Sequence, residues 1–306
     1  MSKPGFQTTW RGATDAWECD QMGHMNVQFY GRKFDESQAV MMTRLGLPLA
    51  SAIAPRPLTD QIVFKRESRS GAVLHTQTAV IGLDRAAGTI RLRHEMYQSA
   101  SDTLAAVLDT VMGGADAQTG ALCPLPAGVL DAAAALLVAP NAVNAPAQPE
   151  LPGPAGGVSG RAAADFGLKE TLVSLVRPGD LAAGGLLTRQ AYISRLSQAV
   201  GHLIASDAIS AEALRARHIG SAALDYKVRW LAPSRPGDIV VLRSGSSGIV
   251  GRTLRLFHWL FDEASGTPLA TVEIVAVYFD MQARKAIEVP DEIRALMAGQ
   301  TAAWPG

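Results

Sequence analysis

Residues 17–30 read WECDQMGHMNVQFY, which places a carboxylate, a glycine, a histidine and an asparagine directly before a predicted helix. Asn26 is a residue type that commonly caps a helix, because its side-chain oxygen accepts from a free backbone N–H. The N–H groups and the positive dipole end at a helix start can also stabilise an anion. Asp20 can act there as base or nucleophile, although Asp-x-x-Gly is also common in simple turns.

The helix is predicted over residues 26–45, with Gly46 as its stop signal. Its apolar face at helical spacing comprises Phe29, Tyr30, Phe34, Ser37, Val40 and Met41. Runs typical of strands follow at residues 62–64, 74–81, 89–97 and 104–112. A single apolar helix must be covered, so we expect one helix followed by an antiparallel meander that curves around it.

The same pattern occurs twice in the chain. Arg91-Leu92-Arg93-His94 matches Arg255-Leu256-Phe257-His258, at an offset of 164 residues. Further matches keep the same order at offsets of 162 to 166: Tyr30 with Tyr192, and Ser68-Arg69-Ser70-Gly71 with Ser234-Arg235-Pro236-Gly237. The second copy has a predicted helix at residues 188–205 and strands at 226–230, 239–243, 253–261 and 269–279. The sequence therefore predicts an α+β duplication.

The domain organisation follows from this repeat. We expect the first repeat over residues 6–114 and the second over residues 159–299. Residues 115–158 are rich in Ala, Pro and Gly, which is typical of a linker. A short helix fits residues 129–138, and the rest of the linker is expected to be extended.

The composition excludes several classes of protein. Lys plus Arg and Asp plus Glu are 28 each, so the formal net charge is zero and neither a nucleic-acid nor a membrane partner is expected. The sequence has no 18-residue apolar run and no apolar N-terminal stretch, so we predict no transmembrane helix and no signal peptide. The expected location is cytoplasmic, with Cys19 and Cys123 reduced.

The run Asp20-x-x-Gly23-His24-x-Asn26-x-x-x-Tyr30 resembles the entry to the central helix in hotdog-fold thioesterases of the 4-hydroxybenzoyl-CoA thioesterase-like superfamily. The resemblance covers both repeats and omits the linker. It implies two tandem hotdog repeats, paired as an internal pseudo-dimer, and hydrolysis of an acyl-CoA or acyl-carrier thioester. It implies no metal and no cofactor, and it leaves further homo-oligomerisation open.

The resemblance also implies roles for single residues. Asp20 acts on the thioester carbonyl, directly or through water, and the backbone N–H of Val27 polarises the thioester oxygen. The amides of Asn26 and Gln28 are expected to share that task. His24 either orients Asp20, contacts substrate or packs as a structural residue. The residues assigned to substrate binding are Gly23, Asn26 and Tyr30.

The second repeat departs from this pattern. Aligned on Tyr192, Asp20 falls opposite Ala182 and His24 falls opposite Leu186, while Asp180 is two residues out of register. We therefore expect one competent site, in the first repeat. His94 and His258 occupy equivalent strand positions, and this repetition favours a structural role for both.

Two residues are weaker candidates. Glu36 lies in the middle of the first helix, where a related branch of thioesterases places a catalytic glutamate. His202, on the second helix, could face the surviving site, although a core or surface position is the favoured interpretation.

Two further hypotheses stay open: a hotdog hydratase or dehydratase, which would pair a histidine with a carboxylate, and a non-catalytic acyl-CoA-binding protein. Lys65, Arg66 and Arg69 form a candidate group for the nucleotide of the substrate, with ordinary surface charge as the default interpretation.

Overall fold

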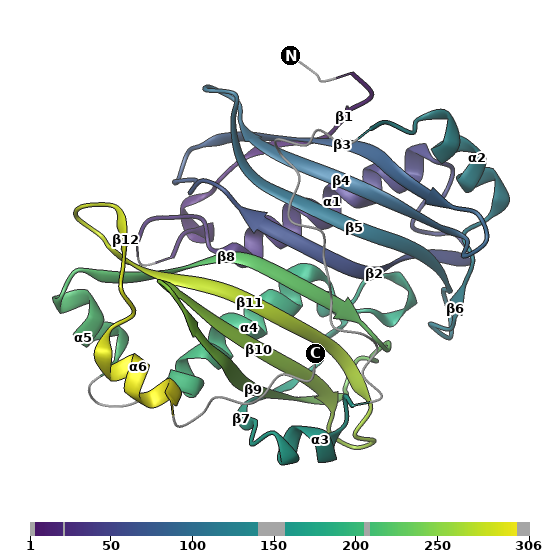
Figure 1. Cartoon of the computed structure of the whole chain (residues 1–306). Coiled ribbons are helices and arrows are strands. Elements are labelled where there is room, and N and C mark those ends of the chain that lie inside the picture. Colours follow the sequence, from purple (N-terminus) through teal and green to yellow (C-terminus); the bar gives the residue numbers. More distant parts are fainter. Residues whose placement is uncertain (1–3, 21, 140–156, 205–208, 299–306) are drawn as a thin grey trace. The chain divides into compact units, whose positions relative to one another are not determined.

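The computed structural model describes residues 4–20, 22–139, 157–204 and 209–298, and the chain divides into two compact units. The first unit comprises Met1–Pro149, Arg177–Ile193 and Ala232–Pro236, and the second comprises Glu150–Val176, Ser194–Leu231 and Gly237–Gly306. Each unit contains an antiparallel sheet with a long helix against it (Figure 1). The predicted α+β class with two repeats is confirmed.

The sheet of the first unit has five main strands in the order β1-β3-β4-β5-β2, all antiparallel to their neighbours. They are β1 (Gln7–Ala13), β2 (Ile53–Phe64), β3 (Val73–Asp84), β4 (Thr89–Gln98) and β5 (Thr103–Asp116), with the short β6 (Leu122–Cys123) paired to β5. The helical elements are η1 (Ala16–Glu18), α1 (Val27–Arg44) and α2 (Ala127–Ala135).

The predicted order of strands is wrong in one respect. The strand that follows α1, β2, pairs with β5 and not with β3, so that only β3, β4 and β5 form a meander. The sequence patterns also miss β1, which pairs with β3. Both features depend on contacts between segments far apart in the chain, which local patterns do not encode.

The second unit repeats this topology. Its strand order in the sheet is β7-β9-β10-β11-β8, which corresponds position by position to β1-β3-β4-β5-β2. Its strands are β7 (Lys169–Leu175), β8 (Ile219–Trp230), β9 (Ile239–Val250), β10 (Thr253–Asp262), β11 (Pro268–Asp280) and the short β12 (Lys285–Ile287). Its helices are α3 (Gly160–Asp165), α5 (Ala211–Ala216), α6 (Asp291–Ala298) and most of α4 (Arg189–Ile204). The turns η3 (Pro178–Asp180) and η4 (Ala183–Gly185) group with the first unit.

The central helix of the first unit starts and ends close to the predicted residues. Gly46 has a φ of 92°, and the N–H of Leu47 donates to the carbonyl of Met42 at 2.9 Å, which closes the helix as expected. The predicted apolar face is partly wrong: Val40 is 37% exposed and Phe29 is half-buried, because both lie at the edge of the buried stripe. The other four residues of the predicted face are buried, namely Tyr30, Phe34, Ser37 and Met41.

Part of the segment predicted as a linker packs onto the first unit. Val129, Leu130 and Ala133 of α2 are buried in one apolar cluster with Met41 and Met42 of α1. The physical reason is that these three apolar side chains share one face of the helix. Removing that face from water stabilises the fold by about 25 cal/mol per Å² of buried apolar surface. Residues 140–156 of the predicted linker and residue 299 lie outside the described residues, and the boundaries at 114 and 158 stay predictions.

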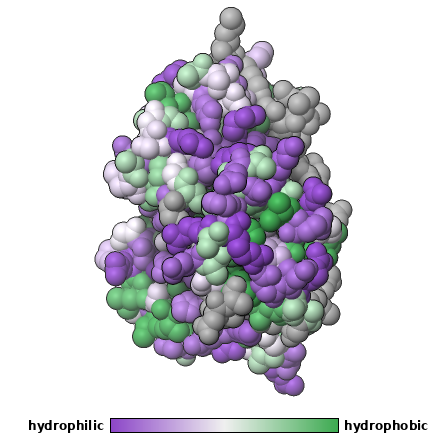
Figure 2. All heavy atoms as spheres, turned by 90° about the vertical axis from the view of Figure 1, so that its left-hand side faces the viewer, coloured by the Kyte–Doolittle hydropathy of each residue, from purple (hydrophilic) through white to green (hydrophobic). Residues whose placement is uncertain are grey.

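No helix in the described parts of the chain is both long enough and apolar enough to cross a membrane. Hydrophilic residues cover much of the face drawn in Figure 2, and hydrophobic residues form smaller groups between them.

The two repeats share a buried chain of side-chain hydrogen bonds. In the first unit the hydroxyls of Thr9 and Thr78 are 2.7 Å apart, and Thr78 is 2.7 Å from Nδ1 of His94. The second unit has the same chain, from Thr171 through Ser244 to Nδ1 of His258, with distances of 2.5 and 2.6 Å. Both imidazoles are fully buried, and this position supports the structural role expected for them.

Burial lowers the pKa of both His94 and His258 to about 3, and for His94 the positive charge of Arg189 acts in the same direction. The folded protein therefore keeps both rings neutral, whereas the unfolded chain takes up protons below about pH 6.5. Because the unfolded state then binds more protons, stability is lost as the pH falls from about 6.5 towards 3.

We expect each buried histidine to lower the free energy of unfolding by roughly 2 kcal/mol between pH 7 and pH 5. Urea unfolding at both pH values should show that His94→Asn and His258→Asn each reduce this loss. His202→Asn is the control, because His202 is exposed on α4. A pH dependence that both buried-site variants leave unchanged would contradict the assignment.

Candidate active site

The loop between η1 and α1 is closed on itself by backbone hydrogen bonds. The N–H of Asp20 donates to the carbonyl of His24 at 2.8 Å, and Cys19 and Met25 form an isolated bridge. The N–H of Gly23 donates to the carbonyl of Asp20 at 2.9 Å, with Gly23 at a φ of 75°. This left-handed conformation favours glycine, so the Asp-x-x-Gly spacing has a direct structural cause.

Only one of the two carboxylate oxygens of Asp20 accepts hydrogen bonds within this turn. Its Oδ1 accepts from the backbone N–H groups of Met22 at 2.8 Å and His24 at 3.3 Å. Within the part of the chain that the structure describes, Oδ2 has no hydrogen-bond partner, and the residue is half-buried. The turn interpretation is therefore correct, and it leaves one carboxylate oxygen available for chemistry.

The amide groups at the start of α1 differ in their partners. Asn26 is the N-cap, as predicted, since its Oδ1 accepts from the N–H of Gln28 at 3.1 Å. The N–H of Asn26 donates to the carbonyl of Glu18 at 2.9 Å. Val27 is the first helical residue and so has no acceptor inside the helix, and its N–H has no other partner among the described residues. Of the three amides expected to polarise a substrate oxygen, only that of Val27 is uncommitted.

A buried ion pair fixes this loop to the helix. Nζ of Lys33 lies 2.6 and 2.7 Å from the two carboxylate oxygens of Glu18, and both side chains are buried. Glu18 Oε2 also accepts from the N–H of Asp15 at 3.1 Å. Sequence reasoning missed this pair, because nothing in a spacing of fifteen residues indicates that a loop residue meets the second turn of a helix.

His24 and Tyr30 both contact the segment that follows β2. His24 Nε2 lies 3.3 Å from Oε2 of Glu67, and His24 is buried. The Tyr30 hydroxyl donates to the carbonyl of Arg66 at 3.3 Å and accepts from the N–H of Ser68 at 3.2 Å. Burial raises the pKa of Tyr30, so the hydroxyl keeps its proton at neutral pH.

The two weaker candidates are exposed residues that belong to different units. Glu36 is exposed on α1, where it accepts from Nε1 of Trp10 at 2.7 Å and from Nε of Arg32 at 3.2 Å. His202 is exposed on α4 and belongs to the second unit. No hydrogen bond or ion pair between Glu36 and Asp20 is present among the described residues.

The loop before α4 repeats the backbone of the Asp20 loop at an offset of 162 residues. The N–H of Ala182 donates to the carbonyl of Leu186 at 2.8 Å, Thr188 donates to Asp180 at 2.8 Å, and Gly185 has a φ of 76°. Asp180 therefore corresponds to Glu18, and Ala182 to Asp20. The carboxylate and the histidine are absent from the second loop, as the sequence alignment predicted.

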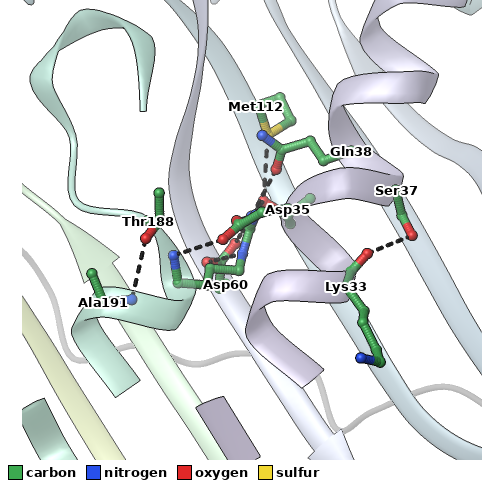
Figure 3. A network of polar contacts seen from close by, with 10 residues as sticks. Lys33, Asp35, Ser37, Gln38, Asp60, Met112, Thr188 and Ala191 are labelled. Atoms are coloured by element: carbon green, nitrogen blue, oxygen red, sulfur yellow. Dashed lines mark hydrogen bonds and ion pairs between the residues drawn. The ribbon is translucent and has the colours of Figure 1, made fainter. Parts of the chain in front are cut away.

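The residue that corresponds to Val27 is Arg189, which belongs to the first unit. Its guanidinium donates to both carboxylate oxygens of Asp60 at 2.8 and 2.9 Å and to Oδ1 of Asp35 at 2.8 Å. Its backbone N–H donates to Oδ2 of Asp35 at 3.0 Å. Figure 3 shows Asp35, Gln38 and Asp60 converging beside Thr188 and Ala191. The amide equivalent to that of Val27 thus binds a carboxylate oxygen.

Close packing accompanies this network. A Cβ placed on Gly31 of α1 would lie 3.1 Å from the backbone carbon of Arg189, so a larger residue would push the start of α4 away. Sequence reasoning missed the role of Asp35, because its partner Arg189 is 154 residues away in sequence.

The charges in this network are unequal, with two carboxylates around one guanidinium. Burial and the neighbouring Asp60 raise the pKa of Asp35 to about 6, although Arg189 opposes this shift. Burial alone would lower the pKa of Arg189, but the carboxylates of Asp60 and Asp35 outweigh it and raise the pKa. Arg189 therefore stays charged, and Asp35 is the member that takes up a proton on mild acidification.

Comparison with protein-family models identifies the family. The model of the thioesterase-like superfamily matches residues 14–133 and 176–297, which are the two repeats. No curated protein matches the chain in sequence.

Solved structures with a similar fold include the putative oleoyl thioesterase of Lactobacillus plantarum, at a TM-score of 0.66 and 12% identity over 90% of this chain and 98% of that chain. An acyl-ACP thioesterase of Bacteroides thetaiotaomicron has a TM-score of 0.62 and 10% identity over 90% and 98% of the two chains. The 12:0-ACP thioesterase of Umbellularia californica has a TM-score of 0.62 and 8% identity over 90% and 95%. At these identities the likeness shows the fold, and with the family match it confirms the predicted tandem hotdog repeats.

The Arg189 network generates a stability prediction. Arg189→Met leaves the buried carboxylate of Asp60 and the half-buried carboxylate of Asp35 without their cation, and we expect a loss of about 3–5 kcal/mol in the free energy of unfolding. Arg161→Met is the matched control, because the Arg161 side chain is 92% exposed and its loss should cost less than about 0.5 kcal/mol. Urea unfolding at pH 7.5 measures both, and equal unfolding midpoints for the two variants would contradict the assignment.

Proposed function

The chain belongs to the thioesterase-like superfamily, and from this membership we propose that it hydrolyses an acyl-CoA or acyl-carrier thioester to a free acid and a thiol. The observation that carries the proposal is the pairing of two uncommitted groups on one loop. Asp20 Oδ2 and the Val27 N–H have no hydrogen-bond partner among the described residues, and they stand at opposite ends of the same short segment.

Asp20 supplies the basic group. Its Oδ2 takes a proton from the water that attacks the thioester carbonyl carbon, or it attacks that carbon itself and forms an anhydride that water then opens. In both routes the C–S bond breaks, the sulfur leaves as thiolate and takes up a proton, and the acyl group leaves as the acid. Water is the only co-reactant.

Val27 supplies the oxyanion donor. A backbone N–H aimed at the developing negative charge contributes about 3–4 kcal/mol to the lowering of a barrier in comparable sites. The second repeat supports this role, since the equivalent N–H of Arg189 binds an oxygen of the Asp35 carboxylate at 3.0 Å. The backbone geometry of this position is therefore suited to an oxygen that carries negative charge.

The neighbouring residues hold this pair in place. Glu18 and Lys33 anchor the start of the loop, and Glu67 anchors His24 near its end. We propose His24 as a positioning residue, whose backbone N–H contributes to the fixing of Asp20 Oδ1. Contact of Gly23, Asn26 and Tyr30 with substrate stays a prediction, as do the internal pairing of the repeats and further oligomerisation.

We propose one active site for each chain. Ala182 and Leu186 replace Asp20 and His24 in the second loop. The backbone N–H of Arg189, which corresponds to that of Val27, already donates to the Asp35 carboxylate. The similar structures are named as an oleoyl thioesterase, an acyl-ACP thioesterase and a 12:0-ACP thioesterase, so we include long-chain and medium-chain acyl groups and acyl-carrier thioesters among the substrates to test.

One observation favours a second candidate function. The His24–Glu67 pair is the combination of imidazole and carboxylate that a hydratase uses to move a proton. Hydration of an enoyl-CoA without release of thiol, lost in Glu67→Gln, would favour this alternative over hydrolysis.

We expect Asp20→Asn to lower kcat for thiol release from the best acyl thioester by at least about a hundredfold, which corresponds to roughly 2.7 kcal/mol. The asparagine keeps an oxygen for the two amides of the turn and removes the base, so the loop retains its shape. Thiol release followed with a chromogenic disulfide across a panel of acyl-CoA and acyl-carrier thioesters measures the effect.

Glu36→Gln is the control for Asp20→Asn, because Glu36 is an exposed carboxylate in the same repeat. It should change kcat by less than about threefold. Full activity of Asp20→Asn would refute the catalytic role of Asp20, and a large loss in Glu36→Gln would transfer that role to Glu36. A wild-type chain that releases no thiol from any member of the panel would refute the hydrolase.

A further inference from the structure

We propose that Lys65, Arg66 and Arg69, here called the basic segment, bind the phosphate groups of the pantetheine carrier of the thioester. This inference rests on the proposed function and names the part of the substrate that the chain recognises. All three side chains are exposed, and none forms an ion pair within the described parts of the chain. Exposed cations without internal partners are free to pair with a ligand.

The backbone of the basic segment is rigid. The N–H groups of Lys65 and Arg66 both donate to the carbonyl of Ala105, at 2.8 and 3.0 Å. The Tyr30 hydroxyl donates to the carbonyl of Arg66, and Nε2 of Gln98 donates to the carbonyl of Glu67 at 2.8 Å. The cations thus project from a fixed scaffold, which reduces the conformational entropy lost when a phosphate binds.

This scaffold is attached directly to the candidate active site. The N–H of Met25 donates to the carbonyl of Ser68 at 2.7 Å, and His24 forms an isolated bridge with Arg69. Glu67, the only acidic residue among residues 65–69, pairs with His24 in the loop that carries Asp20. The three cations therefore give residues 65–69 an excess of positive charge.

The second repeat provides an internal comparison. At an offset of 166 residues, Leu231, Ala232 and Pro233 replace Lys65, Arg66 and Glu67, and only Arg69 has a basic counterpart, Arg235. The backbone position is the same, because the N–H of Leu231 donates to the carbonyl of Leu269 as that of Lys65 does to Ala105. The cations are thus found in the repeat that keeps Asp20 and Val27, and two of them are absent from the repeat that lacks the carboxylate.

The chemistry of biological thioesters fits this arrangement. The acyl group is joined to pantetheine, whose far end carries a diphosphate ester in CoA and a phosphodiester on a carrier protein. The net charge of the chain is zero, so the cations of the basic segment are a local positive charge beside the Asp20 loop. They can bind the phosphate end of the substrate through charge-assisted hydrogen bonds. The same segment would leave the acyl end free to reach Asp20.

The test is equilibrium binding of CoA, dephospho-CoA, pantetheine and a holo carrier protein, measured by calorimetry at 0.1 M salt. In the triple variant Lys65→Glu, Arg66→Glu and Arg69→Glu, we expect the Kd for CoA to rise at least about tenfold, with pantetheine binding unchanged. The control variant Lys169→Glu, Arg161→Glu and Lys285→Glu reverses three exposed cations of the second unit and makes the same change in net charge. It should change the Kd for CoA by less than about threefold.

The outcomes separate the sources of phosphate. Weaker binding of CoA identifies the CoA phosphates, and weaker binding of the holo carrier protein alone identifies the phosphodiester of its arm. Equal effects in the two triple variants, equal weakening of pantetheine, or no measurable binding of CoA, dephospho-CoA or the holo carrier protein by the wild type would overturn the proposal.

These ligands contain no thioester, so their binding does not depend on hydrolysis. Asp20→Asn should bind CoA as the wild type does. If the wild type binds CoA normally but releases no thiol from any thioester, the proposed hydrolysis is refuted. The assignment of the basic segment as a phosphate-binding site then still stands.

Discussion

The backbone amides at the start of a central helix impose the constraint on which the candidate active site depends. The first N–H groups of any helix lack partners inside it, and a buried amide without a partner costs about 1–3 kcal/mol. In the first repeat the Asn26 side chain and the Glu18 carbonyl satisfy two of these groups and leave Val27. In the second repeat a carboxylate from α1 satisfies the equivalent group at Arg189. The first N–H of the central helix is thus treated differently in the two repeats, and only in the first repeat does it lack a partner among the described residues.

Buried charge is used to hold the two loops in place. The Glu18–Lys33 pair anchors the loop of Asp20, and the Arg189 network anchors the start of α4. Buried ion pairs are weak contributors to stability compared with apolar packing, but removal of one partner is costly. Their role here is to fix positions. Two or more hydrogen bonds of defined geometry determine where a loop starts, whereas apolar contacts have no preferred direction. Asp35 adds a second carboxylate to one guanidinium, so the network responds to protons near pH 6.

Duplication followed by divergence explains how structural and chemical residues are distributed. The Thr-Thr-His and Thr-Ser-His chains survive in both repeats, because each sheet must satisfy the same buried imidazole. Groups that the fold does not require, such as the Asp20 carboxylate and the cations of Lys65 and Arg66, are present in one repeat only. The comparison of the two halves therefore distinguishes residues that the fold needs from residues that a reaction would need, without any reference to other proteins.

The sequence by itself determined the duplication, the α+β class, the limits of α1, the Asn26 cap and the loss of Asp20 and His24 from the second loop. All of these depend on residues close together in the chain, where spacing and turn chemistry are informative. Local patterns did not reveal β1, the pairing of β2 with β5, or the packing of α2, because each requires a distant partner. The same holds for Glu18 with Lys33, His24 with Glu67, and Arg189 with Asp35 and Asp60. Which amide and which carboxylate oxygen remain uncommitted was decided by the tertiary structure alone, because a hydrogen-bonding group is free only after every competing partner has been placed.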